Sequence, residues 1–124
     1  MSKTFEDIKA WQLCRKFRKE IYSITRKFPQ NEKFILTPQI LRATISISSN
    51  IAEGFGRYSY QENIQFCRIA RGSVNEVLDQ LYVALDERYI IKDEFDKLYK
   101  EGRELERSIN GYISFIKNQK VSYS

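Results

Sequence analysis

Apolar residues recur at alternating intervals of three and four positions in four separate segments of this chain of 124 residues. This spacing places apolar side chains along one face of an α-helix and is typical of helices that pack side by side. In the first segment the apolar seam comprises Ala10, Cys14, Phe17, Ile21, Ile24 and Phe28. We therefore predict helices over residues 4–28, 37–55, 59–88 and 93–117, followed by a polar tail at 118–124.

Residues with strong helix-end preferences separate the four segments. Thr37 and Pro38 suit the start of the second helix, and Gly54 or Gly56 supplies its end. Ser59 and Glu62 form a capping-box sequence at the start of the third helix. Because the connections are short, neighbouring helices should run in opposite directions. The sequence thus predicts one all-α domain over residues 1–124, an antiparallel up-down-up-down four-helix bundle.

Several classes of activity lack the residues that they need. The chain has no histidine, which removes the commonest general base and the commonest metal ligand. Its two cysteines, Cys14 and Cys67, have no metal-type spacing and fall at apolar helical positions, where we expect buried, reduced thiols. We predict no catalytic residue, no metal site, no cofactor and no enzymatic activity. The chain also lacks a signal-peptide core and a membrane-spanning apolar run, so we expect a cytoplasmic protein.

The second helix carries polar residues on one stripe, and the third helix carries a matching stripe. In an antiparallel hairpin, facing positions keep a constant sum of residue numbers. One register then aligns Gln39 with Gln80, Arg42 with Glu76 and Ser46 with Ser73. We interpret the stripes as a polar ladder centred on an Arg42–Glu76 ion pair; a solvated face and a surface between subunits are the alternatives. The predicted structural and assembly residues are Gln39, Arg42, Ser46, Asn50, Glu53, Arg57, Ser73, Glu76 and Gln80.

These stripes lie within two long motifs. The first is Leu36-Thr37-x-Gln39-x-x-Arg42-Ala43-x-x-Ser46-Ile47-x-x-Asn50-Ile51-Ala52-Glu53-Gly54-x-x-Arg57, and the second is Phe66-x-x-x-Ala70-Arg71-Gly72-Ser73-x-x-Glu76-x-x-x-Gln80-Leu81. Together they resemble the 23S rRNA-intervening-sequence family of bacterial four-helix-bundle proteins, over nearly the whole chain. Ser48 replaces a proline that is usual in that family, and Leu41 replaces a usual arginine.

The resemblance implies a bundle that assembles into a ring-shaped homopentamer without enzymatic activity. Members of this family are encoded within insertions in large-subunit rRNA genes or elsewhere in bacterial genomes. The family is also structurally similar to accessory proteins of diversity-generating retroelements, which are pentameric and bind nucleic acid and a reverse transcriptase. The molecular role of the family itself is poorly defined.

The excess positive charge lies entirely on the first helix. Residues 1–28 contain eight basic and three acidic residues, which accounts for the net charge of +5, while residues 29–124 have equal numbers of each. Cations interleaved with aromatic rings can hold phosphates and stack on bases. The candidate nucleic-acid-binding residues are Lys9, Trp11, Arg15, Lys16, Arg18, Lys19, Tyr22, Arg26 and Lys27.

Two functions remain open at this point. The first is a non-catalytic, self-assembling protein that binds the backbone of RNA or DNA through its basic first helix. The alternative is an oligomeric protein–protein scaffold with no nucleic-acid role. In that case the basic face is merely solvated, and Trp11 and Tyr22 pack against a neighbouring subunit.

Overall fold

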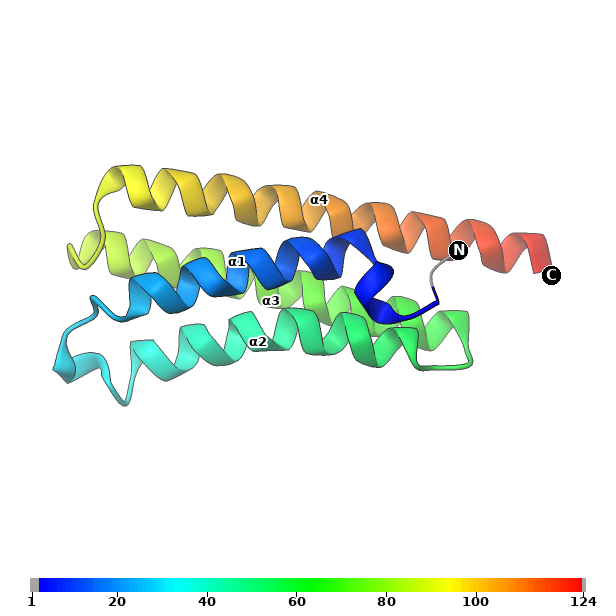
Figure 1. Ribbon diagram of the computed structural model, residues 1–124, viewed down its shortest axis with the longest axis horizontal. Helices are drawn as coiled ribbons and strands as arrows, with labels where there is room; N and C mark the ends of the chain where they lie inside the picture. The colour runs from blue at the N-terminus through cyan, green and yellow to red at the C-terminus, as the bar shows by residue number, and fades with distance from the viewer. Residues whose placement is uncertain (1–2, 124) are drawn as a thin grey trace.

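A computed structural model describes residues 3–123 of the chain, with side chains described as far as residue 119. The elements are η1 (Phe5–Asp7, a short 3₁₀ helix), α1 (Lys9–Thr25), η2 (Gln30–Glu32), α2 (Leu36–Phe55), α3 (Tyr60–Asp86) and α4 (Lys92–Tyr123). No strand occurs between residues 3 and 123. The four long helices form a bundle, in agreement with the predicted fold class (Figure 1).

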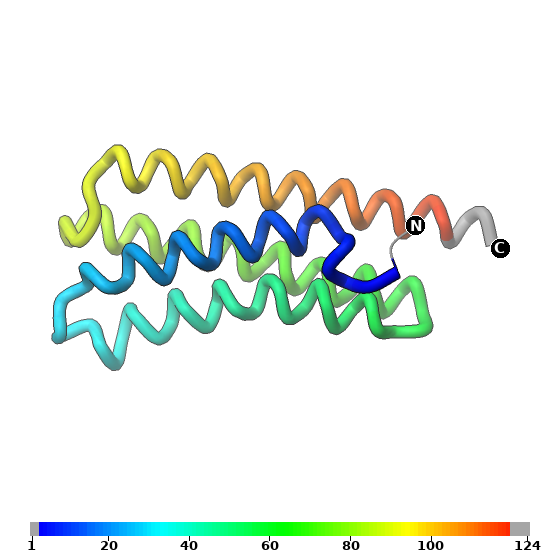
Figure 2. The backbone as a smooth tube through the Cα atoms, in the orientation of Figure 1, coloured from blue at the N-terminus to red at the C-terminus, as the bar shows by residue number. Residues whose placement is uncertain are grey.

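Around the bundle the four helices follow one another in chain order, so that α4 lies beside α1. The α1–α2 and α3–α4 connections lie at one end of the bundle, whereas the α2–α3 turn lies at the other (Figure 1). Each helix packs on the helices before and after it, and α1 also packs on α4. The tube in Figure 2 follows the backbone through the same arrangement, and Figure 1 shows α4 continuing past the α2–α3 turn. Within the described residues, no helix is long and apolar enough to cross a membrane.

The core is built from the predicted seams. Its largest fully buried side chains include Phe17, Ile21, Ile47, Leu81 and Ile109, one or more from each long helix. Burying each such side chain stabilises the fold by about 1.5–3 kcal/mol relative to leaving it exposed. The apolar spacing in the sequence therefore predicted which side of each of the four helices packs in the core.

The most extensive contact between helices in the bundle is between α2 and α3. A Cβ atom added at Gly54 would lie 2.7 Å from Asn63 Oδ1 and 2.9 Å from Phe66 Cβ, so the end of α2 contacts the start of α3 without an intervening side chain. Gly54 has a negative φ, as does Gly56, the residue after α2. α2 nevertheless ends at Phe55 with Gly56 as its C-cap, so one of the two predicted glycines does mark the end of the helix. Gly54 permits close packing on α3.

Two of the predicted helix starts also differ from the structure. The first helix does not begin at residue 4, because Ile8 is extended (φ −76°, ψ 122°) and separates η1 from α1. The second begins at Leu36, one residue before the predicted cap Thr37. Its first N–H is capped from outside the helix, since Leu36 N donates to Glu32 Oε1 over 3.3 Å. Ser59 does cap α3, because its hydroxyl accepts the Glu62 N–H over 3.4 Å.

Helix ends also depart from the prediction. α1 ends at Thr25 and α3 at Asp86, whereas α4 continues to Tyr123 through residues predicted to form a polar tail. Glycine and proline are absent from that tail, so nothing in it disfavours helical geometry. Ser124 lies outside the described residues.

Candidate nucleic-acid interface

The seam of α1 faces the core, so its basic residues lie on the opposite side. Ala10, Cys14, Phe17, Ile21 and Ile24 are buried. Of the nine candidate residues, Trp11, Arg18 and Tyr22 are half-buried, and the other six are exposed: Lys9, Arg15, Lys16, Lys19, Arg26 and Lys27. The structure therefore places seven of the candidates on α1 and Arg26 and Lys27 directly after its end, and it divides them between two edges.

On the edge of α1 that borders α4, acidic groups balance the positive charge of the basic residues. Lys27 forms a salt bridge with Glu94, and hydrogen bonding from Lys27 lowers the pKa of that carboxyl. Lys16 lies near the carboxyl groups of Glu20 and Glu101 and acts on the pKa values of both. Little net positive charge remains along this edge for an external anion.

The edge of α1 that borders α2 has no such compensation. Arg18 fixes it to α2, since its Nη1 donates to Ser48 Oγ over 2.9 Å. At about 100° per residue, Arg15, Lys19 and Arg26 lie about 60–100° around the helix from Arg18, on its outward side. Among the residues whose side chains are described, none forms an ion pair with any of these three. We call Arg15, Arg18, Lys19, Tyr22 and Arg26 the cationic edge.

Trp11 belongs to the chain's own packing rather than to this edge. Its ring lies edge-on to Phe5, with 5.1 Å between centroids, and it packs against the core. Part of the Trp11 ring is therefore covered within the chain, and packing of Trp11 and Tyr22 against a neighbouring subunit stays a prediction. The cationic edge is therefore suited to binding phosphates through its positive charge rather than to stacking on bases.

The predicted ladder between α2 and α3 forms at one end. Ser46 Oγ lies 3.0 Å from Ser73 Oγ, which confirms the predicted register at this pair. Asn50 Nδ2 donates to the Ser46 carbonyl over 2.7 Å and to Ser46 Oγ over 2.9 Å. These polar groups are part-buried and mutually bonded, so they hold the register of the two helices.

The predicted ion pair at the centre of the ladder is absent. Among the described side chains, Arg42 and Glu76 form no salt bridge within 4.0 Å, and both are exposed, where pairing would gain little. Glu76 Oε1 instead accepts from Gln80 Nε2, its neighbour one turn along α3, over 3.5 Å. Gln80 is 7% exposed, and its Oε1 atom has no hydrogen-bond partner in the described part of the chain. Gln39 is exposed to solvent.

The last two predicted stripe residues, Glu53 and Arg57, lie at the end of α2 and form a salt bridge with each other. Arg57 Nη2 donates to Glu53 Oε1 over 2.8 Å, and the Arg57 guanidinium lies 4.9 Å from the centre of the Phe66 ring on α3. This pairing engages the Glu53 carboxylate with a cation.

Within the described residues, no group of three histidine, cysteine, aspartate or glutamate side chains could hold a metal ion. Burial raises the pKa of the Cys14 and Cys67 thiols to about 11 and about 12, as expected for buried cysteines.

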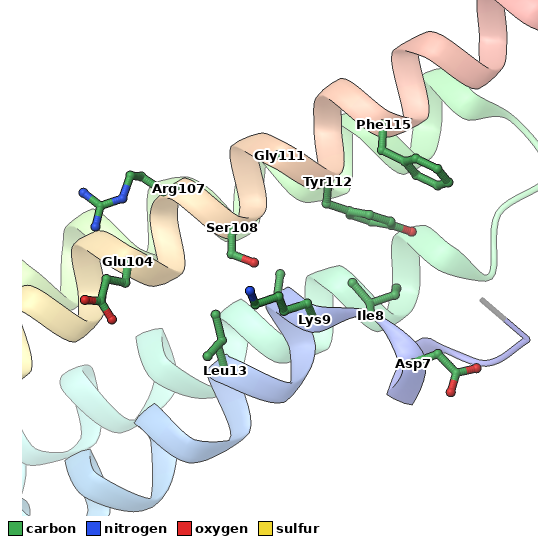
Figure 3. Close-up of a pocket in the computed structure, with 11 residues that line it drawn as sticks. Asp7, Ile8, Lys9, Leu13, Glu104, Arg107, Ser108, Gly111, Tyr112 and Phe115 are labelled. Atoms are coloured by element: carbon green, nitrogen blue, oxygen red, sulfur yellow. The ribbon is translucent and has the colours of Figure 1, made fainter. Parts of the chain in front are cut away.

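A groove between the start of α1 and the end part of α4 was not predicted. It has a volume of about 780 Å³, and Figure 3 shows Ile8 and Leu13 on its α1 side and Tyr112 and Phe115 on its α4 side. Lys9, the remaining candidate, lines it. The sequence carries no signal for this groove, because its walls come from opposite ends of the chain.

The chain is similar to a known protein family and to a solved structure. A family model described as "23S rRNA-intervening sequence protein" matches residues 6–111. A crystal structure of a protein of unknown function, from the S23 ribosomal protein family of Bacteroides thetaiotaomicron VPI-5482, superimposes with a TM-score of 0.77 at 22% identity, covering 84% of this chain and 97% of that one. This likeness supports the fold alone. No protein with curated function matches the chain.

Proposed function

This chain belongs to the 23S rRNA-intervening sequence protein family, and we propose that it is a non-catalytic, self-assembling protein that binds the phosphate backbone of a nucleic acid through its cationic edge. The observation that carries the proposal is the row formed by Arg15, Lys19 and Arg26, which are exposed and have no acidic partner among the described side chains. At 1.5 Å per residue, this row extends about 16 Å along α1. Phosphate contacts of this kind are insensitive to sequence.

The test compares two variants with the same change in net charge. The first, R15Q/K19Q/R26Q, removes the unpaired charges of the cationic edge. The control, R68Q/K100Q/K117Q, removes three exposed cations of α3 and α4. Affinity for a 20-base-pair RNA duplex is measured by fluorescence anisotropy at several salt concentrations.

Each lost phosphate contact should lower the slope of log affinity against log salt by about 0.9. We expect the edge variant to lose about two to three units of slope and the control variant to behave as the wild type. Equal losses in the two variants would show that binding follows net charge rather than this edge. If the wild type shows no binding at 50 mM salt, the nucleic-acid function fails and the scaffold alternative takes its place.

We infer separately that the bundle is antiparallel, up-down-up-down, and that copies of the chain assemble through the outward face of α2 and α3, in a ring that is most simply a homopentamer. Support comes from apolar side chains that helical phase places on this face: Ile69 is 46% exposed and Val83 is 40% exposed. Arg42 and Glu76, which form no ion pair within the described residues, and the Gln80 oxygen without a donor there lie along the same side of these helices, where a second copy would satisfy them.

Solution mass by light scattering tests this assembly. We expect a pentamer for the wild type and dissociation for Ile69→Glu, because the new carboxylate would be buried without a partner. Ile91→Glu, at an exposed position of the α3–α4 connection, is the matched control and should assemble normally. A wild-type monomer at tens of micromolar protein would overturn the inference.

A further inference from the structure

The seam between α1 and α4 is the least closed seam of the bundle. Besides the groove at the start of α1, a hollow of about 200 Å³ lies between Ile24 on α1 and Leu98 on α4. A smaller hollow of about 50 Å³ lies between Phe17 and Glu101. Packing of α1 on α4 is accordingly sparser than that of α2 on α3. Polar contacts across this seam therefore act beside buried apolar residues such as Phe17 and Leu98.

One of these contacts joins two carboxyl groups to a single ammonium group. Lys97 Nζ on α4 lies 3.2 Å from Glu20 Oε1 on α1 and 4.0 Å from Glu101 Oε1, one turn along α4. The carboxyl side chains are only 23% and 24% exposed. Glu20 Oε2 is buried, and no described amide, hydroxyl or cationic group donates to it, which leaves a protonated Glu101 as its donor. Two carboxylates that flank the same ammonium group disfavour each other's ionisation, and a proton shared between them would relieve that repulsion.

The electrostatics of the cluster favour such a shared proton. Burial, together with hydrogen bonding to Glu20 and its negative charge, raises the pKa of Glu101 to about 7. Burial opposes ionisation of Glu20 too, but hydrogen bonds from Glu101 and Lys97 outweigh it and lower the pKa of Glu20. The other facing groups are Lys16 on α1, whose charge favours ionisation of both carboxyls, and Glu104 on α4, which lines the small hollow with Lys16 and Glu101. The Lys27–Glu94 salt bridge also joins the end of α1 to the start of α4.

We propose that Glu20, Lys97 and Glu101 form a proton-sensitive clasp, which holds α1 against α4 while the carboxyls share a proton and weakens this contact when both are ionised. The sign follows from the pKa of Glu101, which is higher in the folded chain than its ordinary value of 4.5. The native state then binds this proton more tightly than the unfolded state does. The contribution of Glu101 is fully present at its ordinary pKa of 4.5 and is lost as the pH rises through about 7. Below pH 4.5 the lowered pKa of Glu20 acts in the opposite direction.

Urea unfolding at pH 5.5 and pH 8.0 tests the clasp. The unfolding equilibrium constant of the wild type should rise by about 25-fold between these pH values. Glu101→Gln keeps a neutral hydrogen-bond donor beside Glu20, so it should remove most of this rise. Glu104→Gln removes a carboxylate of the same small hollow and should retain the rise. Wild-type pH dependence in Glu101→Gln would overturn the proposal.

A second measurement does not depend on the stability of any variant. In carbon-13 spectra of the wild type, one carboxyl of the Glu20–Glu101 pair should titrate near pH 7. The lowered pKa values of Asp7, Glu94 and Glu106 keep those carboxyls out of this range. Titration of both Glu20 and Glu101 below pH 5 would refute the clasp.

Discussion

Replacement of Gly54 by alanine tests the close contact between α2 and α3. The added Cβ would lie 2.7 Å from Asn63 Oδ1, 2.9 Å from Phe66 Cβ and 3.0 Å from the Asn63 carbonyl oxygen. The side-chain amide could rotate away, but the carbonyl and the Phe66 Cβ are fixed to the backbone of α3. The two helices would therefore have to separate by several tenths of an ångström along their tightest contact.

The magnitude follows from two opposing terms. Overpacking of a tightly packed core costs about 1–3 kcal/mol, and we expect the upper value because backbone atoms are involved. Alanine gains about 1 kcal/mol over glycine in helix propensity. Gly54→Ala should therefore lower the free energy of unfolding by about 2 kcal/mol. Gly111→Ala is the matched control, because no atom lies within 4 Å of the added Cβ, and it should stabilise the protein by up to about 1 kcal/mol.

Urea unfolding followed by circular dichroism at 222 nm measures both variants. The order predicted is Gly111→Ala, wild type and Gly54→Ala, from most to least stable. A Gly54→Ala variant as stable as the wild type would refute the reasoning, because it would mean that α2 and α3 are not in backbone contact at this point.

Three further predictions concern single features of the fold. Arg88 has a positive φ of 64°, which glycine adopts without strain, so Arg88→Gly should raise the free energy of unfolding by about 1 kcal/mol in urea titrations; a loss would contradict this. A double-mutant cycle of Ser46→Ala and Ser73→Ala should give a coupling of about 0.5–1.5 kcal/mol, whereas additive effects would show that the two hydroxyls do not interact. Because burial raises the pKa of Cys14 and Cys67 to about 11 and about 12, neither thiol should react with Ellman's reagent at pH 8 until the protein unfolds; rapid labelling of the native protein would argue against their burial.

The helical core could be predicted from the sequence because it depends on local periodicity. Residues such as Phe17 and Ile21 repeat at intervals that only one face of a helix satisfies, and the structure buries both. The Ser46–Ser73 contact was also predictable, since a short turn fixes the register of neighbouring helices. Ion pairing between Arg42 and Glu76 was not, because long exposed side chains have many conformations and gain little from pairing.

Helix ends were less predictable because their caps come from outside the helix or from unusual residues. Glu32, four residues before Leu36, supplies the cap that the sequence pattern assigned to Thr37. At the end of α3, Arg88 takes the left-handed position that glycine usually occupies. Its N–H donates to the Leu85 carbonyl over 3.0 Å, and the next N–H donates to the Ala84 carbonyl over 2.8 Å, which closes the helix without glycine.

The candidate site was only partly predictable for a related reason. Charge counting finds the basic helix, but it cannot distinguish Lys27, which pairs with Glu94, from Arg26, which has no ion pair among the described residues. That distinction depends on how α4 lies against α1, and the two helices are far apart in the sequence. The same long-range contact creates the groove and the Glu20–Lys97–Glu101 cluster.

Covalent footprinting of the wild-type protein with a bound RNA duplex tests the nucleic-acid interface most directly. Lysine acetylation and arginine modification, read by mass spectrometry, report the accessibility of each cation without any mutation. The account predicts that the duplex slows modification of Arg15, Lys19 and Arg26, while the three control positions on α3 and α4 react at the rate of the free protein. Protection at the control positions alone, or at none of these residues, would contradict the claim that the cationic edge of α1 is the binding surface.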